Sequence, residues 1–126
     1  MKEIKFRGKR VDNGEWAKGY FVGDYDGNHY ITQPLVNSHR LIRVIPETVG
    51  QFTGLKDAYG TEIYEGDIVK LCETNPVLFQ AECMLCKYGY QFIFRDLDNG
   101  RISGEYFIDK CEVVGNIHAE VSDEKI

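Results

Sequence analysis

The sequence predicts a mainly β protein, folded as a small and partly open or closed barrel with little or no long helix. Gly, Asn and Asp interrupt the chain at short intervals, and the segments between them are rich in aromatic and β-branched residues. No segment keeps a helical period beyond two turns. Short strands joined by regularly spaced turns are typical of small barrels.

Two turn signals divide the first part of the chain into hairpins. Asp12–Gly14 and Asp26–Asn28 each combine Asn with Gly, and these residues accept positive φ readily. We expect a loop over Pro34–Arg40 and a strand end at Pro46. The strands predicted here are Ile4–Val11, Trp16–Val22, Phe21–Tyr25, His29–Thr32 and Leu41–Ile45.

The second part of the chain starts with turn residues and continues with further strands. Residues 46–67 consist mostly of turn-forming residues and leave little room for a regular element. Asn75–Lys87 is the one stretch where a short helix competes with a strand, and turns are expected near Gly89 and over Asp98–Gly100. The predicted strands are Ile63–Tyr64, Ile68–Leu71, Phe79–Cys86, Tyr90–Arg95 and Val113–Ile117.

Composition predicts a folded protein without a membrane span. The chain has 126 residues, of which 43% are hydrophobic and 28% charged, as in folded globular proteins. No apolar run approaches the roughly 20 residues that cross a bilayer. The first residues turn charged again before an apolar signal region forms, so we expect no secretory signal and a cytoplasmic location.

The net charge of −5 conceals an asymmetry along the chain. Residues 1–50 hold 8 basic and 6 acidic residues, whereas residues 51–126 hold 7 basic and 14 acidic residues. The basic excess gathers in the first strand, which we interpret as a solvated edge strand, because charges blunt sheet edges. The alternative is a phosphate-contacting stripe, for which the candidates are Lys5, Arg7, Lys9 and Arg10.

The four cysteines predict no disulfide framework, because the chain shows no export signal. Cys83 and Cys86 have zinc-knuckle spacing, but Cys72 and Cys111 do not form a second close pair. We therefore expect free cysteines in reduced cytosol, without a metal or cofactor. The alternation from Phe79 to Cys86 further predicts that Cys83 is buried.

Three blocks of sequence resemble the YopX-like family of phages and prophages of Gram-positive hosts. The first runs from Ile4 to Trp16, and the last covers Val113–Ile117. The central block, Glu47–Val69, is the most specific. The motif residues of the central and last blocks are Thr48, Gly50, Thr53, Gly54, Asp57, Gly60, Glu65, Gly66, Asp67, Gly115 and Asn116.

The resemblance implies an N-terminal β-hairpin region over residues 1–45 and an SH3-like barrel over residues 46–120. The polar end, residues 121–126, is expected to be a flexible tail. The resemblance also implies a phage or prophage protein that acts inside the host cell. It brings no catalytic residue with it, and we expect the motif residues to be structural, with Asp67 accepting backbone N–H bonds in its turn.

Catalysis is disfavoured by the absence of a nucleophile elbow, a phosphate-binding glycine loop or a zinc-protease motif. The candidates for acid–base chemistry are Asp57, Glu65, Asp67 and His39, and His118 has no partner that the sequence identifies. Each is more readily explained as a turn residue or a solvated side chain.

The sequence therefore predicts a non-enzymatic interaction or assembly module whose partner is a host or phage protein. Small β-barrels bind partners through exposed grooves, edges and aromatic side chains. Self-association is the neighbouring possibility, and nucleic-acid binding through the basic first strand is the alternative. The tyrosines considered for exposure are Tyr20, Tyr25, Tyr30, Tyr59, Tyr64, Tyr88 and Tyr90.

Overall fold

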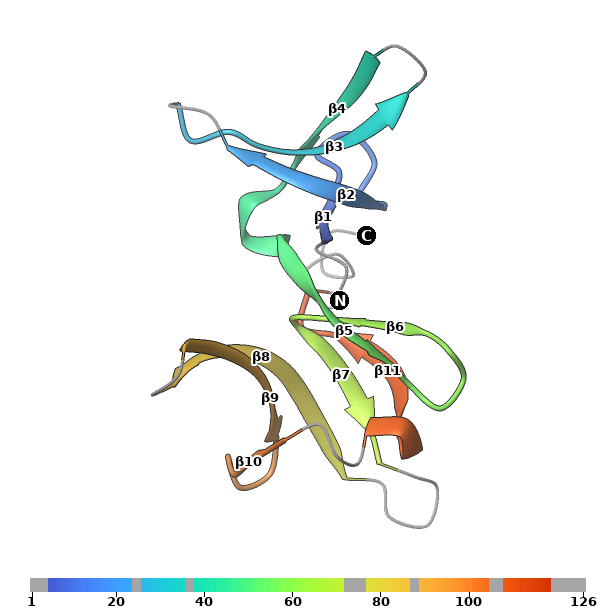
Figure 1. The fold of residues 1–126 in the computed structure, drawn as a ribbon, viewed down its shortest axis with the longest axis vertical. Helices are drawn as coiled ribbons and strands as arrows, with labels where there is room; N and C mark the ends of the chain where they lie inside the picture. The colour runs from blue at the N-terminus through green and yellow to red at the C-terminus, as the bar shows by residue number, and fades with distance from the viewer. Residues whose placement is uncertain are drawn as a thin grey trace. The chain divides into compact units, whose positions relative to one another are not determined.

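The computed structural model describes residues 5–23, 26–35, 38–71, 77–86, 89–104 and 108–118 (Figure 1). For residues 34, 35, 38, 39, 85, 86, 89, 90 and 109 it describes the backbone alone. The chain divides into two compact units, Met1–Phe52 and Thr53–Ile126, which we call unit 1 and unit 2. The predicted tail, residues 121–126, lies outside the described residues.

Unit 1 is an antiparallel sheet in which consecutive strands are neighbours, β4-β3-β2-β1, with the start of β5 beside β1. The predicted turn glycines Gly14 and Gly27 both have positive φ, at 74° and 85°. The elements are β1 (Phe6–Lys9), β2 (Trp16–Gly23), β3 (His29–Leu35), β4 (Ser38–Val44), the 3-10 helix η1 (Pro46–Thr48) and β5 (Gly50–Lys56).

Close approach of the backbone in unit 1 depends on two strand glycines. A Cβ on Gly8 would lie 2.9 Å from the Cβ of Val44, and a Cβ on Gly19 would lie 2.4 Å from the carbonyl oxygen of Thr32. Glycine is required where another chain segment comes this near. The buried hydrophobic residues of the unit 1 core are Ala17, Ile31, Ile42 and Val44.

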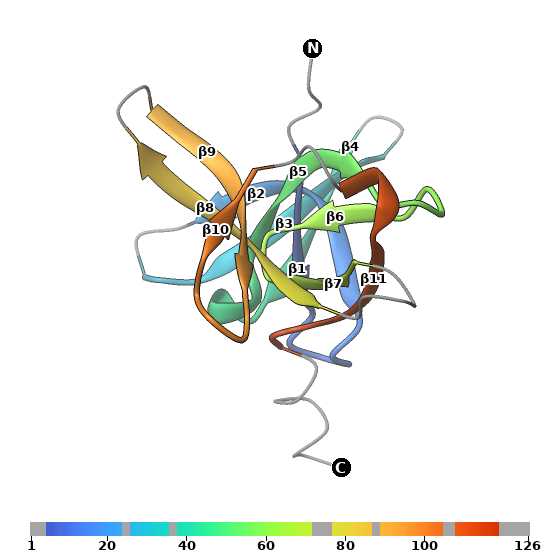
Figure 2. The same ribbon diagram turned by 90° about the horizontal axis from the view of Figure 1, so that it is seen from below.

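Unit 2 contains a five-stranded antiparallel sheet in the order β10-β9-β8-β7-β11. The remaining strand of the unit, β6, is the neighbour of β5. β8 pairs with β7 only over Gln80 to Leu78, so the rest of the β8–β9 hairpin extends beyond β7 (Figure 2). The elements are β6 (Glu62–Tyr64), β7 (Asp67–Lys70), β8 (Leu78–Cys86), β9 (Gly89–Asp96), β10 (Ile102–Ser103), η2 (Ile108–Lys110) and β11 (Glu112–Asn116).

The mainly β class is confirmed, and the described residues contain no α-helix. The described strands form two antiparallel sheets, and neither closes into a barrel, so the SH3-like closure expected for residues 46–120 is not confirmed. In unit 2 the sheet ends at the two-residue strand β10 on one side and at β11 on the other. The unit 2 core contains Ile63, Val69, Phe79, Ala81, Phe94, Ile108 and Cys111.

Three local predictions were wrong. Residues 46–67 hold the seven-residue strand β5 rather than turns alone, because Gly54, with φ of 84°, is accommodated within it. The expected loop over Pro34–Arg40 is mostly strand, since Pro34 lies beyond the last β2–β3 pair and its missing N–H removes no bond there. β1 is not an edge strand, because it pairs with β2 on one side and β5 on the other.

The stretch Asn75–Lys87 resolves in favour of a strand, β8, over its described part. Its alternation places Phe79 and Ala81 in the core as predicted, but Cys83 is exposed rather than buried. The reason is that β8 runs past β7 after Gln80, so its outer half has a strand neighbour only in β9.

We predict that Gly19→Ala destabilises the protein, because the new methyl group meets the backbone oxygen of Thr32 rather than a movable side chain. The expected loss is about 1–3 kcal/mol of unfolding free energy, measured by urea denaturation. Gly23→Ala in the same strand is the matched control, since its nearest atom would be Phe21 Cζ at 3.7 Å, an ordinary contact. Equal stability of the two variants would contradict the close-approach argument.

Candidate functional site: the exposed face and edge of unit 1

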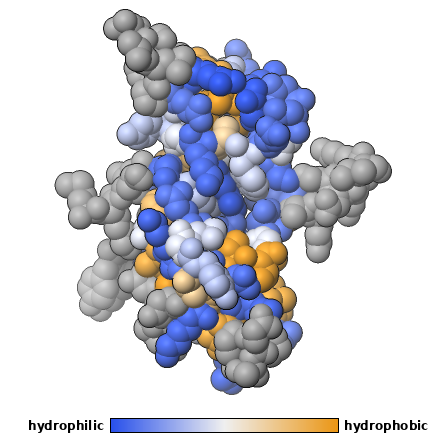
Figure 3. All heavy atoms as spheres, turned by 90° about the vertical axis from the view of Figure 1, so that its right-hand side faces the viewer, coloured by the Kyte–Doolittle hydropathy of each residue, from blue (hydrophilic) through white to orange (hydrophobic). Residues whose placement is uncertain are grey.

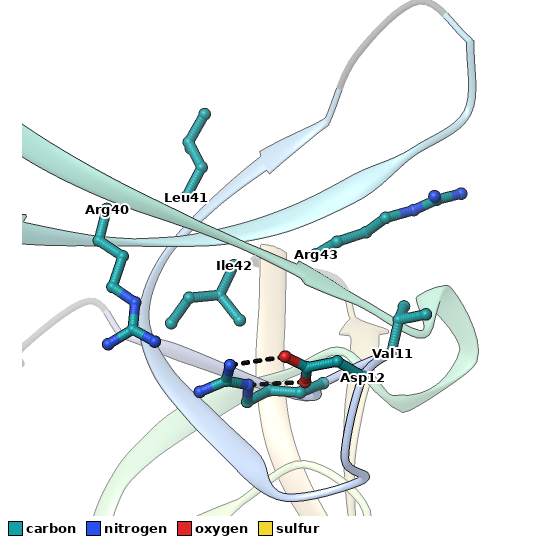
Figure 4. Close-up of a pocket in the computed structure, with 7 residues that line it drawn as sticks. Val11, Asp12, Arg40, Leu41, Ile42 and Arg43 are labelled. Atoms are coloured by element: carbon teal, nitrogen blue, oxygen red, sulfur yellow. Dashed lines mark hydrogen bonds and ion pairs between the residues drawn. The ribbon is translucent and has the colours of Figure 1, made fainter.

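A pocket of about 300 Å³ lies in unit 1 where the turn after β1 meets β4 (Figure 4). It is rich in arginine and is bordered by two exposed aliphatic side chains, those of Val11 and Leu41. Its lining residues are Arg10, Val11, Asp12, Arg40, Leu41, Ile42 and Arg43.

One ion pair is formed inside this pocket. The Arg10 guanidinium donates through Nε to Asp12 Oδ1 at 2.9 Å and through Nη2 to Asp12 Oδ2 at 2.8 Å. This two-bond geometry fixes the carboxylate in the plane of the guanidinium. The hydrogen bonds from Arg10 lower the pKa of Asp12, and the attraction between the charges acts in the same direction. Asp12 is therefore ionised and engaged at neutral pH.

The other two arginines of the pocket have different surroundings. Arg43 donates to Asn28 Oδ1 at 2.7 Å, and in Figure 4 its side chain extends away from the Arg10–Asp12 pair. Arg40 is exposed, and its guanidinium lies on the same side of β4 as that pair in Figure 4. Two guanidinium groups, those of Arg10 and Arg40, therefore lie on this side of β4 against the one carboxylate of Asp12, which favours an anionic group.

The edge of β4 is paired over part of its length. Val11 donates its N–H to the Arg43 carbonyl at 3.0 Å, and Ile45 donates its N–H to the Lys9 carbonyl at 2.8 Å. These bonds flank an antiparallel bridge between Arg10 and Val44. Because backbone groups alternate in direction along a strand, the N–H and C=O of Leu41 also point away from β3. Among the described strands none pairs with β4 on that side.

The face of the sheet opposite the unit 1 core carries two cross-strand rows. In the first row, Tyr20, Thr32 and Leu41 are directly opposite one another on β2, β3 and β4. In the second row, Val22, Tyr30 and Arg43 are directly opposite one another on the same three strands. We call these six residues the outer face: Tyr20, Val22, Tyr30, Thr32, Leu41 and Arg43. Tyr20 is 59% exposed and Leu41 is 61% exposed, so both ends of the first row are uncovered.

Exposed apolar side chains also occur in unit 2, where hydrophobic atoms gather on the lower part of the face in Figure 3. They come from turns, from β10 and from β11 as well as the start of β8, and no two of them are directly opposite each other in the described strand pairs. The exposed large hydrophobic residues of unit 2 are Tyr59, Leu78, Leu97, Ile102, Val114 and Ile117.

The four predicted phosphate-contact residues do not form one exposed stripe. Arg7 and Lys9 are each only 7% exposed, and both lie over the Trp16 ring, with Arg7 Cζ at 4.1 Å and Lys9 Nζ at 5.5 Å from its centre. Lys5 Nζ lies 5.0 Å from the centre of the Phe52 ring. Arg10 alone lines the pocket. Stacking of this kind holds cations against aromatic faces.

The polar motif residues bond to the main chain. Thr48 Oγ1 accepts from Lys9 N–H at 2.9 Å, and Thr53 donates its hydroxyl to the Ile63 carbonyl at 2.7 Å. Asp67, which the sequence predicted to be a backbone acceptor, accepts the Tyr64 N–H at 2.8 Å. These residues are buried and hold strands and turns together.

Asp57 has the largest set of such bonds. Its Oδ1 accepts the N–H groups of Tyr59 and Thr61, at 2.8 and 2.9 Å, and its Oδ2 accepts the N–H of Val113 at 2.9 Å. One carboxylate therefore closes the turn after β5 and fastens it to β11. Its oxygens are committed to the fold.

The motif glycines serve backbone geometry. Gly54, Gly60 and Gly66 have φ of 84°, 83° and 94°, which favours glycine. Gly115 lies in β11 at a shift of register against β7, and Gly50 pairs with Arg7. The remaining motif residue of β11, Asn116, accepts the His118 N–H at 2.8 Å through Oδ1.

The titratable candidates outside unit 1 do not assemble a larger cluster. Glu65 lies near Cys83, whereas the side chains of His39 and Cys86, and all of Cys72, lie outside the described part. The described residues contain no group of three or more His, Cys, Asp or Glu placed to hold a metal ion. Neither Cys83 nor Cys111 forms a disulfide bond.

The tyrosines considered for exposure from the sequence differ in how exposed they are in the structure. Tyr59 is the most exposed of the named tyrosines at 76%, whereas Tyr64 is fully buried. Tyr25 and Tyr88, and the side chain of Tyr90, lie outside the described part. Nowhere in the described segments is there a helix with the length and apolar character to cross a membrane.

Sequence reasoning missed the pocket arginines Arg40 and Arg43. Both flank or belong to a strand that it predicted, Leu41–Ile45, but their alternation with Leu41 and Ile42 does not reveal that β4 ends the sheet. Whether a strand lies at the edge of a sheet depends on the order of the strands, and the local sequence pattern does not predict that order.

We predict that Asp57→Ala lowers unfolding free energy by about 1–3 kcal/mol or more, because backbone donors lose their shared acceptor. Asp57→Asn should fall between wild type and Asp57→Ala, since the amide keeps one acceptor oxygen. Asp98→Ala, at an exposed turn, is the control and should change stability little. Thermal and urea unfolding measure all three, and a neutral Asp57→Ala would refute the role assigned to this carboxylate.

We predict slow alkylation of Cys83 at neutral pH. Loss of hydration raises the pKa of the Cys83 thiol, and the nearby Glu65 carboxylate raises it further. The reactive thiolate therefore forms at a higher pH than in an ordinary cysteine. Iodoacetamide labelling across a pH series, resolved by peptide mass spectrometry, measures the midpoint.

Glu65→Gln should shift the Cys83 midpoint to lower pH, because it removes the negative charge that opposes the thiolate. Asp98→Asn is the matched control and should leave the midpoint in place. A midpoint that is the same in wild type and Glu65→Gln would contradict the assigned charge effect.

Comparison with known proteins gives a family and a structural neighbour. The sequence matches the family described as YopX protein over residues 5–121. The crystal structure of protein EF1440 from Enterococcus faecalis is similar in fold, with a TM-score of 0.59 and 19% identity over 96% of this chain and 97% of that chain. No functionally curated protein matches. Because the match covers nearly the whole chain in agreement with its motif blocks, this protein belongs to the YopX family.

Proposed function

We propose that this chain is a non-enzymatic interaction module of a phage or prophage that binds a protein partner in the cytoplasm of the bacterial host. The observation that carries the proposal is the outer face of unit 1, with its uncovered tyrosine, leucine and arginine side chains. The binding site is the outer face together with the adjoining β4 edge.

The outer face has the composition of a protein-binding surface. Tyr and Arg are enriched at interfaces, and Tyr gives a large contact area with little loss of side-chain freedom. Cross-strand neighbours such as Tyr20, Thr32 and Leu41 form one continuous surface because they lie in a single row. A rigid sheet presents this surface without a folding cost on binding.

A non-enzymatic role is supported by how the carboxylates are used. Asp57 and Asp67 are buried and accept backbone N–H bonds, so neither is placed to exchange protons with a substrate. In unit 1, Asp12 is held by Arg10 in a two-bond ion pair. These are structural uses of acids.

Nucleic-acid binding through β1 is the weaker proposal. It requires Arg7 and Lys9 to reach phosphates, yet both side chains are buried over Trp16. The residues from 51 onward, with 7 basic against 14 acidic side chains, further repel a phosphate backbone. A mobility-shift assay at low and high salt tests it, and salt-sensitive binding at low salt would favour this alternative.

The protein-binding proposal is tested by affinity capture from host lysate with matched double variants. Tyr20→Ser with Leu41→Ser should reduce capture of the specific partner at least about tenfold, since these are two large and exposed side chains of the outer face. Tyr59→Ser with Leu97→Ser removes the same residue types at exposed positions of unit 2 and should leave capture unchanged.

Circular dichroism must show that both double variants fold, so that loss of capture reports the surface. If the two variants retain the same proteins in equal amounts, the outer face is not the binding site. Light scattering of the purified chain checks self-association, and a dimer lost only with the outer-face variant would identify a second copy as the partner.

A further inference from the structure

We infer that the edge of β4 at Leu41, which pairs with none of the described strands, binds an extended acidic segment of the protein partner as an added β-strand. The inference rests on the proposed function and specifies the chemistry of the partner. It is carried by the direction of the backbone groups at Leu41 and by the arginines around the edge.

The backbone at this edge already has the geometry of strand pairing. The segment Arg10–Val11 pairs with β4 around Val44, and the chain then turns away at Asp12. The next outward-pointing groups along β4 are the N–H and C=O of Leu41, which an incoming strand would meet in register. Peptides commonly bind by adding a strand to such an edge.

The charge around the edge selects an acidic strand. Arg10 and Arg40 lie beside it, and the acids that offset the Arg10 charge are its bonded partner Asp12 and, by charge attraction, Glu15. Arg40 has no ion pair with any described residue. A Glu or Asp side chain entering the pocket would give Arg40 a partner and extend the Arg10–Asp12 pair into a network.

The two faces of β4 further predict an alternating sequence in the partner. Arg40 and Ile42 share the core-facing side of the strand, where the pocket is, whereas Leu41 and Arg43 belong to the outer face. An added strand would therefore place acidic side chains toward Arg40 and apolar side chains toward Leu41. Nucleic acid has no backbone donors and acceptors with this spacing.

The volume of the pocket suits a single side chain of the partner peptide better than a cofactor. A volume of about 300 Å³ lies at the lower limit of small-molecule sites. The Arg40 and Ile42 side chains extend from β4 toward the side of the Arg10–Asp12 pair, as Figure 4 shows. The peptide backbone would lie along β4, with its carboxylates reaching inward.

Fluorescence anisotropy with synthetic peptides tests the inference directly. A labelled peptide alternating Glu and Val should bind saturably to the full chain. The matched peptide with Lys in place of Glu, and a Glu/Val peptide N-methylated on the bonding face, should each bind at least about tenfold more weakly. Equal binding of all three peptides would overturn the inference.

Variants at the edge separate backbone pairing from charge. Leu41→Pro removes an N–H that does not serve β3, and Leu41→Ala shortens the side chain but keeps that N–H. The proline variant should bind the Glu/Val peptide several-fold more weakly than the alanine variant. Arg40→Glu should abolish binding, whereas Arg101→Glu, exposed in unit 2, should not.

Amide hydrogen exchange on the wild-type chain gives a readout that does not depend on a folded variant. The Leu41 amide should become protected when the Glu/Val peptide is added, and unchanged exchange at Leu41 would refute strand addition. If the outer-face variant loses partner capture but the Glu/Val peptide does not bind the wild-type chain, only the strand-addition inference is contradicted. If the peptide binds but the outer-face variant still captures the partner as the wild type does, only the outer-face proposal is contradicted.

Discussion

The stretch of chain from η1 to β7 depends on buried Thr and Asp side chains that form hydrogen bonds with backbone groups. Thr48, Thr53, Asp57 and Asp67 all lie in the segment that leads from unit 1 into unit 2, and each bonds to the main chain. Glycines with positive φ make these turns possible, but the turns also leave backbone donors without strand partners. A hydroxyl or carboxylate at each such point removes the penalty of burial. This accounts for the Gly, Thr and Asp residues of the family motif, which also contains Glu65 and Asn116.

The same constraint explains what the sequence could and could not predict. Asn-Gly turns were recognisable because their conformational preference is local, and Gly14, Gly27 and Gly100 all have positive φ. β5 was missed because Thr53 and Gly54 look like turn residues until their bonding partners are known. A side chain that bonds to Ile63, ten residues away, leaves no local periodic signal.

The distribution of charge along the chain likewise does not reveal which residues become neighbours in the folded protein. The basic first strand has the composition of a solvated edge, but β1 pairs on both sides, and Trp16 covers Arg7 and Lys9. The aromatic ring is supplied by β2, the strand that pairs with β1 in the hairpin. The pocket arginines are Arg10, which the sequence identifies as a phosphate-contact candidate, and Arg40 and Arg43 of β4, which it does not.

The position of the available edge follows from how unit 1 folds back on itself. Natural sheets blunt their edges with charges, bulges or covering segments. Here Arg10 and Val11 cover the end of β4 near Val44, and close packing at Gly8 allows β1 to approach that strand. Because the covering segment turns away at Asp12, it leaves Leu41 uncovered while bringing Arg10 beside Arg40. The interaction that closes one part of the edge therefore also builds the charged pocket beside the open part, and the positive charge would repel edge pairing by a basic strand while favouring an acidic one.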